Sequence, residues 1–217
     1  MASKKKPQDA PRSYRQFCGA AKALDVIGGR WSLLVVRNLL LGPQRFADLL
    51  AQLPGVPKNL LSARLKELRQ AGVVQQVNDR YALTAAGLEL EPVVIELGRW
   101  GARFLNAPAR DDVVNPAWGV ISLKRRYAGG ERLQVELEIS EPHARTFELQ
   151  LTPQKLVCLE RAASAPELRV ALRPGAFRQL FFAGTPARAL EKGGALRVTG
   201  HPDAWRRFQR AMQLDPR

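Results

Sequence analysis

Two short helical patterns joined by a Pro/Gly turn decide the fold of this chain. The first is Phe46-Ala47-Asp48-Leu49-Leu50, the turn is Pro54-Gly55-Val56-Pro57, and the second is Asn59-Leu60-Leu61-Ser62-Ala63-Arg64-Leu65-Lys66-Glu67-Leu68. Leucines in the second pattern recur at intervals of three and four, which places them on one side of a helix. The stretch predicts a helix-turn-helix whose second helix has a small, polar outer face.

A β-hairpin and a new helix start follow the helix-turn-helix. Residues 73–77 and 80–83 have strand-like sequences and bracket the turn pair Asn78-Asp79. Thr84 offers a hydroxyl to cap the helix after the hairpin. This order of elements is the one in which a DNA-binding protein places one helix in the major groove and a wing beside it. Residues 24–87 are therefore predicted to form a winged helix-turn-helix.

Further helices are expected on both sides of this motif. Before it, residues 18–27 end at Gly28-Gly29, and residues 31–41 end at Gly42-Pro43. Within the motif we expect helices over residues 44–53 and 58–71, and after it one long helix from Thr84 to Leu105, with Pro92 at a first turn or a kink.

The end of that long helix carries an apolar stripe. Its residues recur at intervals of four, three and four, and the stripe is long for so small a domain. A partner helix from a second copy is a natural use for it. The predicted dimer contacts are Leu24, Val93, Leu97, Trp100 and Phe104.

The pattern changes after a linker at residues 107–116. Apolar residues alternate with polar ones over 135–139 and 147–151, and strand-like runs follow at 156–159 and 168–172. Helices (174–183 and 186–192), a strand (195–198) and a last helix (202–214) come next. The predicted fold class is α+β, divided into a disordered basic tail (1–12), a DNA-binding and dimerisation domain (13–106), the linker (107–116) and a C-terminal domain (117–217).

Composition is that of an ordinary globular protein with a strong positive charge. The net charge is +14, and residues 1–110 contain 17 basic and 8 acidic side chains, whereas residues 111–217 contain 17 and 12. The excess of charge favours a polyanionic partner, and it is larger in the half with the helix-turn-helix. Two cysteines, no apolar run of about 20 residues and no signal peptide indicate a cytoplasmic protein without a membrane partner.

The N-terminal part resembles the HxlR family of bacterial winged-helix regulators, relatives of the MarR group. The resemblance rests on Cys18, residues 23–32, residues 39–46, residues 60–68 and residues 81–87, which match in order and spacing. It implies a homodimer, built from the first and last helices of the domain, that represses or activates nearby genes.

Three departures from the family pattern stand out. Pro57-Lys58 replaces the usual Ser-Pro, which removes the hydroxyl that normally caps the recognition helix. The wing tip, residues 77–80, is short, so its reach into the minor groove is in doubt, and Gly19 replaces the usual proline after the cysteine.

The C-terminal part resembles the sterol-carrier-type lipid-binding domain, over residues 166–172, 177–184 and 195–205. This looser resemblance implies a five-stranded sheet with helices over one face and an apolar cavity between them. The side chains that could line such a cavity, or simply fill a core, are Phe177, Leu180, Phe181, Phe182, Trp205 and Phe208.

Major-groove readout needs short or bidentate side chains on an exposed helix face. Asn59 can pair with adenine, Ala63 can touch a thymine methyl, and Lys66 can reach guanine or phosphate. A solvated face is the alternative, and the family resemblance favours DNA contact. Arg64 either contacts DNA or pairs with an acid inside the domain. The predicted DNA contacts are Arg45, Lys58, Asn59, Ser62, Ala63, Arg64, Lys66 and Arg80.

Cys18 has two interpretations. A buried cysteine behaves as a small hydrophobic residue. Relatives in the HxlR family use a cysteine here to sense oxidants or electrophiles, and a helix N-terminus with Arg15 and Lys22 nearby would lower its pKa.

Enzymatic function is not expected, because the chain has no metal-ligand spacing, no phosphate-binding loop and two histidines only. We expect no cofactor. Two functions compete: a dimeric, sequence-specific transcriptional regulator, probably modulated by an apolar ligand or by Cys18 oxidation, and a lipid or small-molecule carrier whose basic domain binds DNA non-specifically. The residues favour the first, acting as a repressor.

Overall fold

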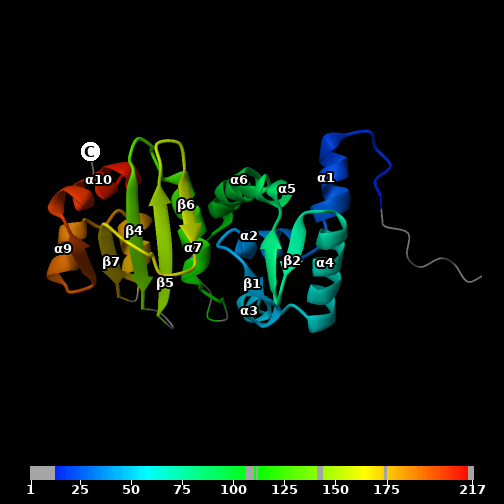
Figure 1. The fold of residues 1–217 in the computed structure, drawn as a ribbon, viewed down its shortest axis with the longest axis horizontal. Helices are drawn as coiled ribbons and strands as arrows, with labels where there is room; N and C mark the ends of the chain where they lie inside the picture. Colours follow the sequence, from blue (N-terminus) through cyan, green and yellow to red (C-terminus); the bar gives the residue numbers. More distant parts are fainter. Residues whose placement is uncertain (1–12, 106–109, 111, 141–143, 174, 215–217) are drawn as a thin grey trace, which may run out of the picture.

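The computed structural model describes residues 13–105, 110, 112–140, 144–173 and 175–214. The predicted basic tail, residues 1–12, and most of the first half of the predicted linker, residues 106–109 and 111, lie outside the described residues. Each half of the chain has its own sheet, and Figure 1 shows the sheets side by side with α2, α6 and α7 between them. This arrangement is an α+β fold, as predicted.

The N-terminal unit is a winged helix-turn-helix. Its helix-turn-helix, hairpin and short third strand are those the sequence predicts, in the same order. The elements are α1 (Gly19–Ile27), α2 (Ser32–Leu39), β1 (Gln44–Arg45), α3 (Phe46–Gln52), α4 (Lys58–Gln70), β2 (Val74–Val77), β3 (Arg80–Leu83), α5 (Ala85–Leu88), α6 (Glu91–Gly101) and the 3-10 helix η1 (Ala102–Phe104).

Two helix boundaries differ from the prediction. The third helix begins at Phe46 rather than Gln44, because Gln44 and Arg45 pair with β3 as a short antiparallel strand. The helix expected to run continuously to Leu105 is broken between α5 and α6. Pro92 then falls in the first turn of α6, where its missing N–H costs no helical hydrogen bond.

The C-terminal unit is a mixed five-stranded sheet with the order β6-β5-β4-β7-β8, in which only β4 and β7 pair in parallel. The number of strands agrees with the expectation from the sterol-carrier-type resemblance. The elements are α7 (Pro116–Ser122), the 3-10 helix η2 (Leu123–Arg125), β4 (Leu133–Ile139), β5 (Arg145–Leu151), β6 (Leu156–Leu159), β7 (Leu168–Leu172), α8 (Ala176–Phe181), α9 (Ala187–Lys192), β8 (Leu196–Gly200) and α10 (Pro202–Met212).

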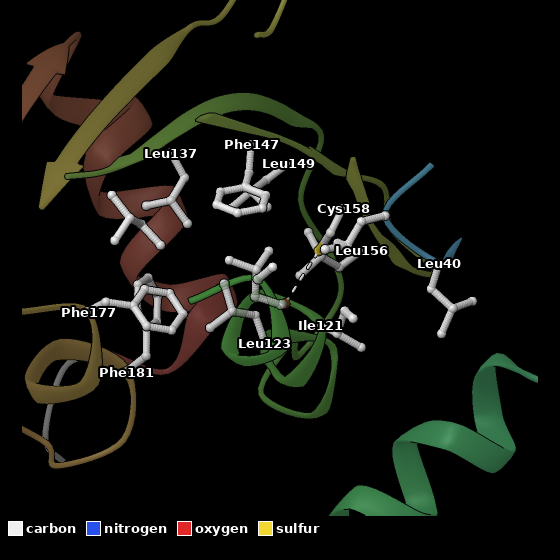
Figure 2. Close-up of a cluster of buried hydrophobic side chains, with 14 of the residues drawn as sticks. Leu40, Ile121, Leu123, Leu137, Phe147, Leu149, Leu156, Cys158, Phe177 and Phe181 are labelled. Carbon is white, nitrogen blue, oxygen red and sulfur yellow. Dashed lines mark hydrogen bonds between the residues drawn. The ribbon is translucent and has the colours of Figure 1, made fainter. Parts of the chain in front are cut away.

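Helix α7 is an element that the sequence analysis missed. Asn115 caps it by accepting the N–H of Ala117, and Pro116 occupies its first turn. The Asn-Pro pair is a helix-start signal that could have revealed it. Figure 2 shows Ile121 of α7 and Leu123 of η2 in the cluster with side chains of β4, β5 and α8. The helix is therefore part of the C-terminal core rather than of a linker.

The two units pack against each other. The backbone N–H of Glu160, after β6, donates to the Leu41 carbonyl oxygen at 2.8 Å. The guanidinium of Arg37 on α2 lies 4.2 Å from the ring centroid of Trp118 on α7, and burial lowers the pKa of Arg37 to about 10. Buried apolar residues of both units belong to one contiguous cluster. The C-terminal unit is thus held directly against the helix that supports the helix-turn-helix.

Candidate nucleic-acid interface

The orientation of α4 follows from its leucines. Leu61, Leu65 and Leu68 are at most 2% exposed, so this side of the helix is fixed in the core. The opposite side, which carries Asn59, Ser62, Ala63 and Lys66, is exposed. The structure therefore places these four predicted DNA contacts together on one accessible helix face.

The first turn of α4 has no side-chain cap. Pro57 is the N-cap residue, and Lys58 is exposed at the first helical position. The first N–H groups of a helix have no intrahelical acceptor, and together with a lysine they form a favourable place for a phosphate. The substitution of the family's usual hydroxyl cap thus leaves amide donors and a positive charge at this end.

Arg64 is used inside the domain. Its guanidinium pairs with Glu67, and its Nε donates to the Arg30 carbonyl oxygen at 3.2 Å. A Cβ at Gly29 would lie 3.0 Å from the guanidinium carbon, so the glycine leaves room for this side chain. Of the two interpretations of Arg64, the structure favours the internal pair: Arg64 joins α4 to the loop before α2.

Arg45 and Arg80 lie directly opposite each other in the small sheet, where β1 pairs with β3. Arg45 Nε is 2.6 Å from Asp79 Oδ2, and both side chains are well exposed. Arg80 Nη1 donates to the Pro43 carbonyl oxygen at 3.2 Å. Two predicted phosphate contacts that are 35 positions apart in the chain thus form one basic pair at the base of the wing, and Asp79 partly neutralises it.

The hairpin is fastened to the following helix by Thr84. Its hydroxyl accepts the Gly87 N–H at 3.1 Å and donates to the Gly72 carbonyl oxygen at 2.5 Å, which confirms the predicted cap. A Cβ at Gly87 would lie 2.1 Å from the Val73 carbonyl oxygen. The Thr-x-x-Gly pattern therefore fixes the wing relative to α5.

Cys18 is an exposed thiol at the N-cap of α1. Backbone N–H groups of Ala21 and, to a smaller extent, Ala20 lower its pKa. The helix N-terminus has the predicted effect, whereas Arg15 and Lys22 are not among the causes. The other cysteine differs in every respect: Cys158 is fully buried, and burial raises its pKa to about 12. Of the two interpretations of Cys18, the buried hydrophobic one is wrong.

The predicted dimer contacts are exposed apolar side chains. Trp100 and Phe104 are in edge-to-face contact, with ring centroids 5.0 Å apart, and are 55% and 63% exposed. No residue of α6 is buried in the single chain. Leu24, Val93 and Leu97 are between 45% and 49% exposed.

The predicted pocket side chains pack mainly against one another. The ring centroids of Phe177 and Phe181 are 5.1 Å apart, and Trp205 is stacked on Phe208 at 5.8 Å. Phe177, Leu180, Phe181 and Phe208 are buried, Trp205 is half-buried, and Phe182 is exposed. This packing favours the core interpretation over a cavity wall, so nothing in it supports the carrier function.

Within the part of the chain that the structure describes, no helix is long and apolar enough to cross a membrane. Among the same residues, no three His, Cys, Asp or Glu side chains gather in a way that could hold a metal ion.

Comparison with known proteins agrees with the geometry of this unit. Residues 26–109 match the family model described as HxlR-like helix-turn-helix. The uncharacterized HTH-type transcriptional regulator YvaP of Bacillus subtilis is 38% identical over 92 residues, which are 39% of this chain and 85% of that protein. The uncharacterized HTH-type transcriptional regulator Mb3122 of Mycobacterium bovis is 35% identical over 94 residues, which are 40% of this chain and 59% of that protein.

Among solved structures, the quinone-bound YodB of B. subtilis is similar at 33% identity and a TM-score of 0.37, over 39% of this chain and 97% of that one. The family match ends at residue 109, so the resemblance of residues 117–217 to the sterol-carrier-type domain stays a prediction. Through its N-terminal unit, the chain belongs to the HxlR-like helix-turn-helix family of DNA-binding transcription regulators.

Proposed function

We propose that this regulator is a homodimeric repressor that reads its operator with α4 in the major groove. The observation that carries the proposal is the face of Asn59, Ser62, Ala63 and Lys66. It is exposed, and none of these side chains has a hydrogen bond or an ion pair with another described residue. Uncommitted short and polar side chains near the start of a recognition helix are the groups that such motifs direct at base edges.

The proposed dimer rests on the apolar side chains of α1, α6 and η1. Exposed large side chains in one run, such as Leu97, Trp100 and Phe104, mark protein–protein contact in soluble proteins. A second copy would present the same surface, as twofold interfaces require. Two recognition helices related by this axis would then meet two half-sites on the DNA.

Fluorescence anisotropy on DNA from upstream of the protein's own gene, against scrambled DNA at physiological salt, tests the proposal. We expect a preference of about a thousandfold or more. Asn59→Ala should lose about 1–3 kcal/mol of that discrimination, because the bidentate pair with adenine is lost. Gln70→Ala, at the far end of the same helix, is the matched control and should bind as the wild type does. Equal, steeply salt-dependent binding to both DNAs would refute sequence-specific readout at this promoter.

Arg80 is proposed to contact phosphate, so its loss should act differently. Arg80→Ala should weaken binding to both DNAs alike and reduce the slope of log K against log salt by about 1. A change in sequence preference instead would assign Arg80 to base readout.

We further propose that oxidation of Cys18 relieves repression. The exposure of the thiol and its lowered pKa favour the reactive thiolate. In a reporter assay, the wild type should lose repression in oxidant and a Cys18→Ser variant should keep it. Cys158→Ser controls for the buried thiol and should respond as the wild type does. An oxidant response that survives Cys18→Ser would contradict the proposal.

A further inference from the structure

The seam between the two units contains a polar cleft of about 330 Å³. The winged-helix unit supplies the start of β1, one side of α3 and Arg80, and the C-terminal unit supplies Glu160. The contact between the Glu160 N–H and the Leu41 carbonyl oxygen closes one side of the cleft. The cleft is therefore bounded by both units and adjoins the base of the wing.

Two amide oxygens at this cleft lack donors. Gln44 is 6% exposed, and its Nε2 donates to the Asn38 carbonyl oxygen at 2.9 Å, which fixes the orientation of the amide. Gln44 Oε1 is buried and accepts no hydrogen bond, and the same is true of Gln52 Oε1. Buried polar atoms are nearly always hydrogen-bonded in folded proteins, so two acceptors without donors in one cleft indicate a missing donor group.

Carboxylates add to this excess of acceptors. Asp48 Oδ2 accepts the Arg45 N–H at 3.1 Å, and Glu160 Oε1 accepts Arg145 Nε at 2.7 Å, so each carboxylate uses one oxygen in these bonds. Arg80 is the one guanidinium among the lining residues. An ammonium group has three donors and no acceptor, which matches a wall of amide and carboxylate oxygens. Arg80 in turn offers a bidentate partner to a carboxylate.

We propose that this cleft binds a small molecule with a primary ammonium group, and that a free amino acid fits it best. The ammonium group would satisfy Gln44 and Gln52, and the carboxylate would pair with Arg80. The volume lies at the lower end of the range for small-molecule sites, which suits a ligand of this size. A diamine shares the ammonium chemistry but leaves Arg80 without a partner.

Occupancy of the cleft would oppose DNA binding, a consequence that rests on the proposed function. Arg80 cannot hold a ligand carboxylate and a DNA phosphate with the same donors. If ligand and DNA compete for it, each lowers the affinity of the other by the same factor.

Thermal unfolding of the full chain without DNA tests the site. The probes are the free L-amino acids, their N-acetyl derivatives and 1,4-diaminobutane. We expect at least one free amino acid to raise the melting temperature, and its N-acetyl derivative to lose the effect. Stabilisation by the diamine alone would support the ammonium site and assign it to polyamines. No stabilisation by any amine, or equal stabilisation by the N-acetyl forms, would overturn the proposal.

A matched pair of variants on α3 locates the binding. Ala51 lines the cleft and Ala47 does not, and both are exposed on the same helix. Ala51→Leu should fill the cleft and abolish stabilisation by the ligand, whereas Ala47→Leu should preserve it. Stabilisation that persists in Ala51→Leu would place the ligand elsewhere and refute the assignment.

The effect on DNA is measured separately by anisotropy with the identified amino acid. We expect a loss of affinity of roughly 5- to 150-fold, the usual range of coupling between two sites. Because the melting experiment contains no DNA, a failure of operator binding would refute the proposed function and leave the ligand site intact.

Discussion

Helices α6 and α10 have the same length and similar sequence features, but opposite surroundings. Both have 11 residues, a proline in the first turn and an aromatic pair. Four residues of α10 are buried, including Phe208, and none of α6 is buried. Both helices are amphipathic, so the pattern predicts an apolar face in each case but does not say what covers it. In α10 the chain covers that face itself, and in α6 it leaves the face exposed.

The largest expected effect is on the buried side of this comparison. Phe208 is fully buried and contacts the rings of Phe181 and Trp205. Phe208→Ala should lower the free energy of unfolding by about 3–5 kcal/mol, because it removes a large apolar side chain and leaves a cavity. Denaturant titration of dilute protein measures this change. Trp100→Ala on α6 is the matched control and should change the stability of the monomer by less than about 0.5 kcal/mol. Equal losses would mean that α6 is not an exposed helix.

The second prediction concerns the exposed side. Leu97→Glu should weaken dimerisation by about 2 kcal/mol or more, roughly 30-fold, because a carboxylate would be buried without a partner in the proposed interface. Analytical ultracentrifugation measures the dissociation constant. Glu96→Gln, on the same exposed helix, should leave it nearly unchanged. A dimer that tolerates Leu97→Glu would require a different interface.

The smallest effect is electrostatic. Hydrogen bonds from Arg207, and then from Arg210, lower the pKa of Glu131 and join α10 to the start of β4. A lowered pKa in the folded state means that the stabilisation is present above the unfolded value of about 4.3 and is lost as the pH falls through the folded value. Wild type should exceed Glu131→Gln by up to about 1 kcal/mol near pH 7, and by nothing near pH 2.

The pair Glu96–Arg99 of α6 provides the comparison for this measurement. Its side chains are about 60% exposed, so solvent screens the pair. Glu96→Gln should therefore show almost no difference from wild type at either pH. A pH-independent deficit in Glu131→Gln would show that the carboxamide disturbs packing rather than charge.

Local sequence signals account for much of the DNA-binding unit. The leucine spacing of α4, the Asn78-Asp79 turn and the Thr84 cap are decided by residues a few positions apart, and the structure confirms all three. The alternation of apolar residues predicted the strands of the C-terminal sheet in the same way. The missed helix α7 is short and contains Gly119, so its periodicity is weak.

The sequence by itself determined the winged helix-turn-helix, because helix faces, turns and caps follow from contacts between near neighbours. Only the tertiary structure decided which partner each side chain found. It placed Arg45 opposite Arg80, engaged Arg64 with the Arg30 carbonyl oxygen, and left the amide oxygens of Gln44 and Gln52 without donors beside Glu160. It also covered the apolar face of α10 and exposed that of α6. These outcomes depend on residues that are tens of positions apart, which a periodic pattern cannot relate because the period describes only one element at a time.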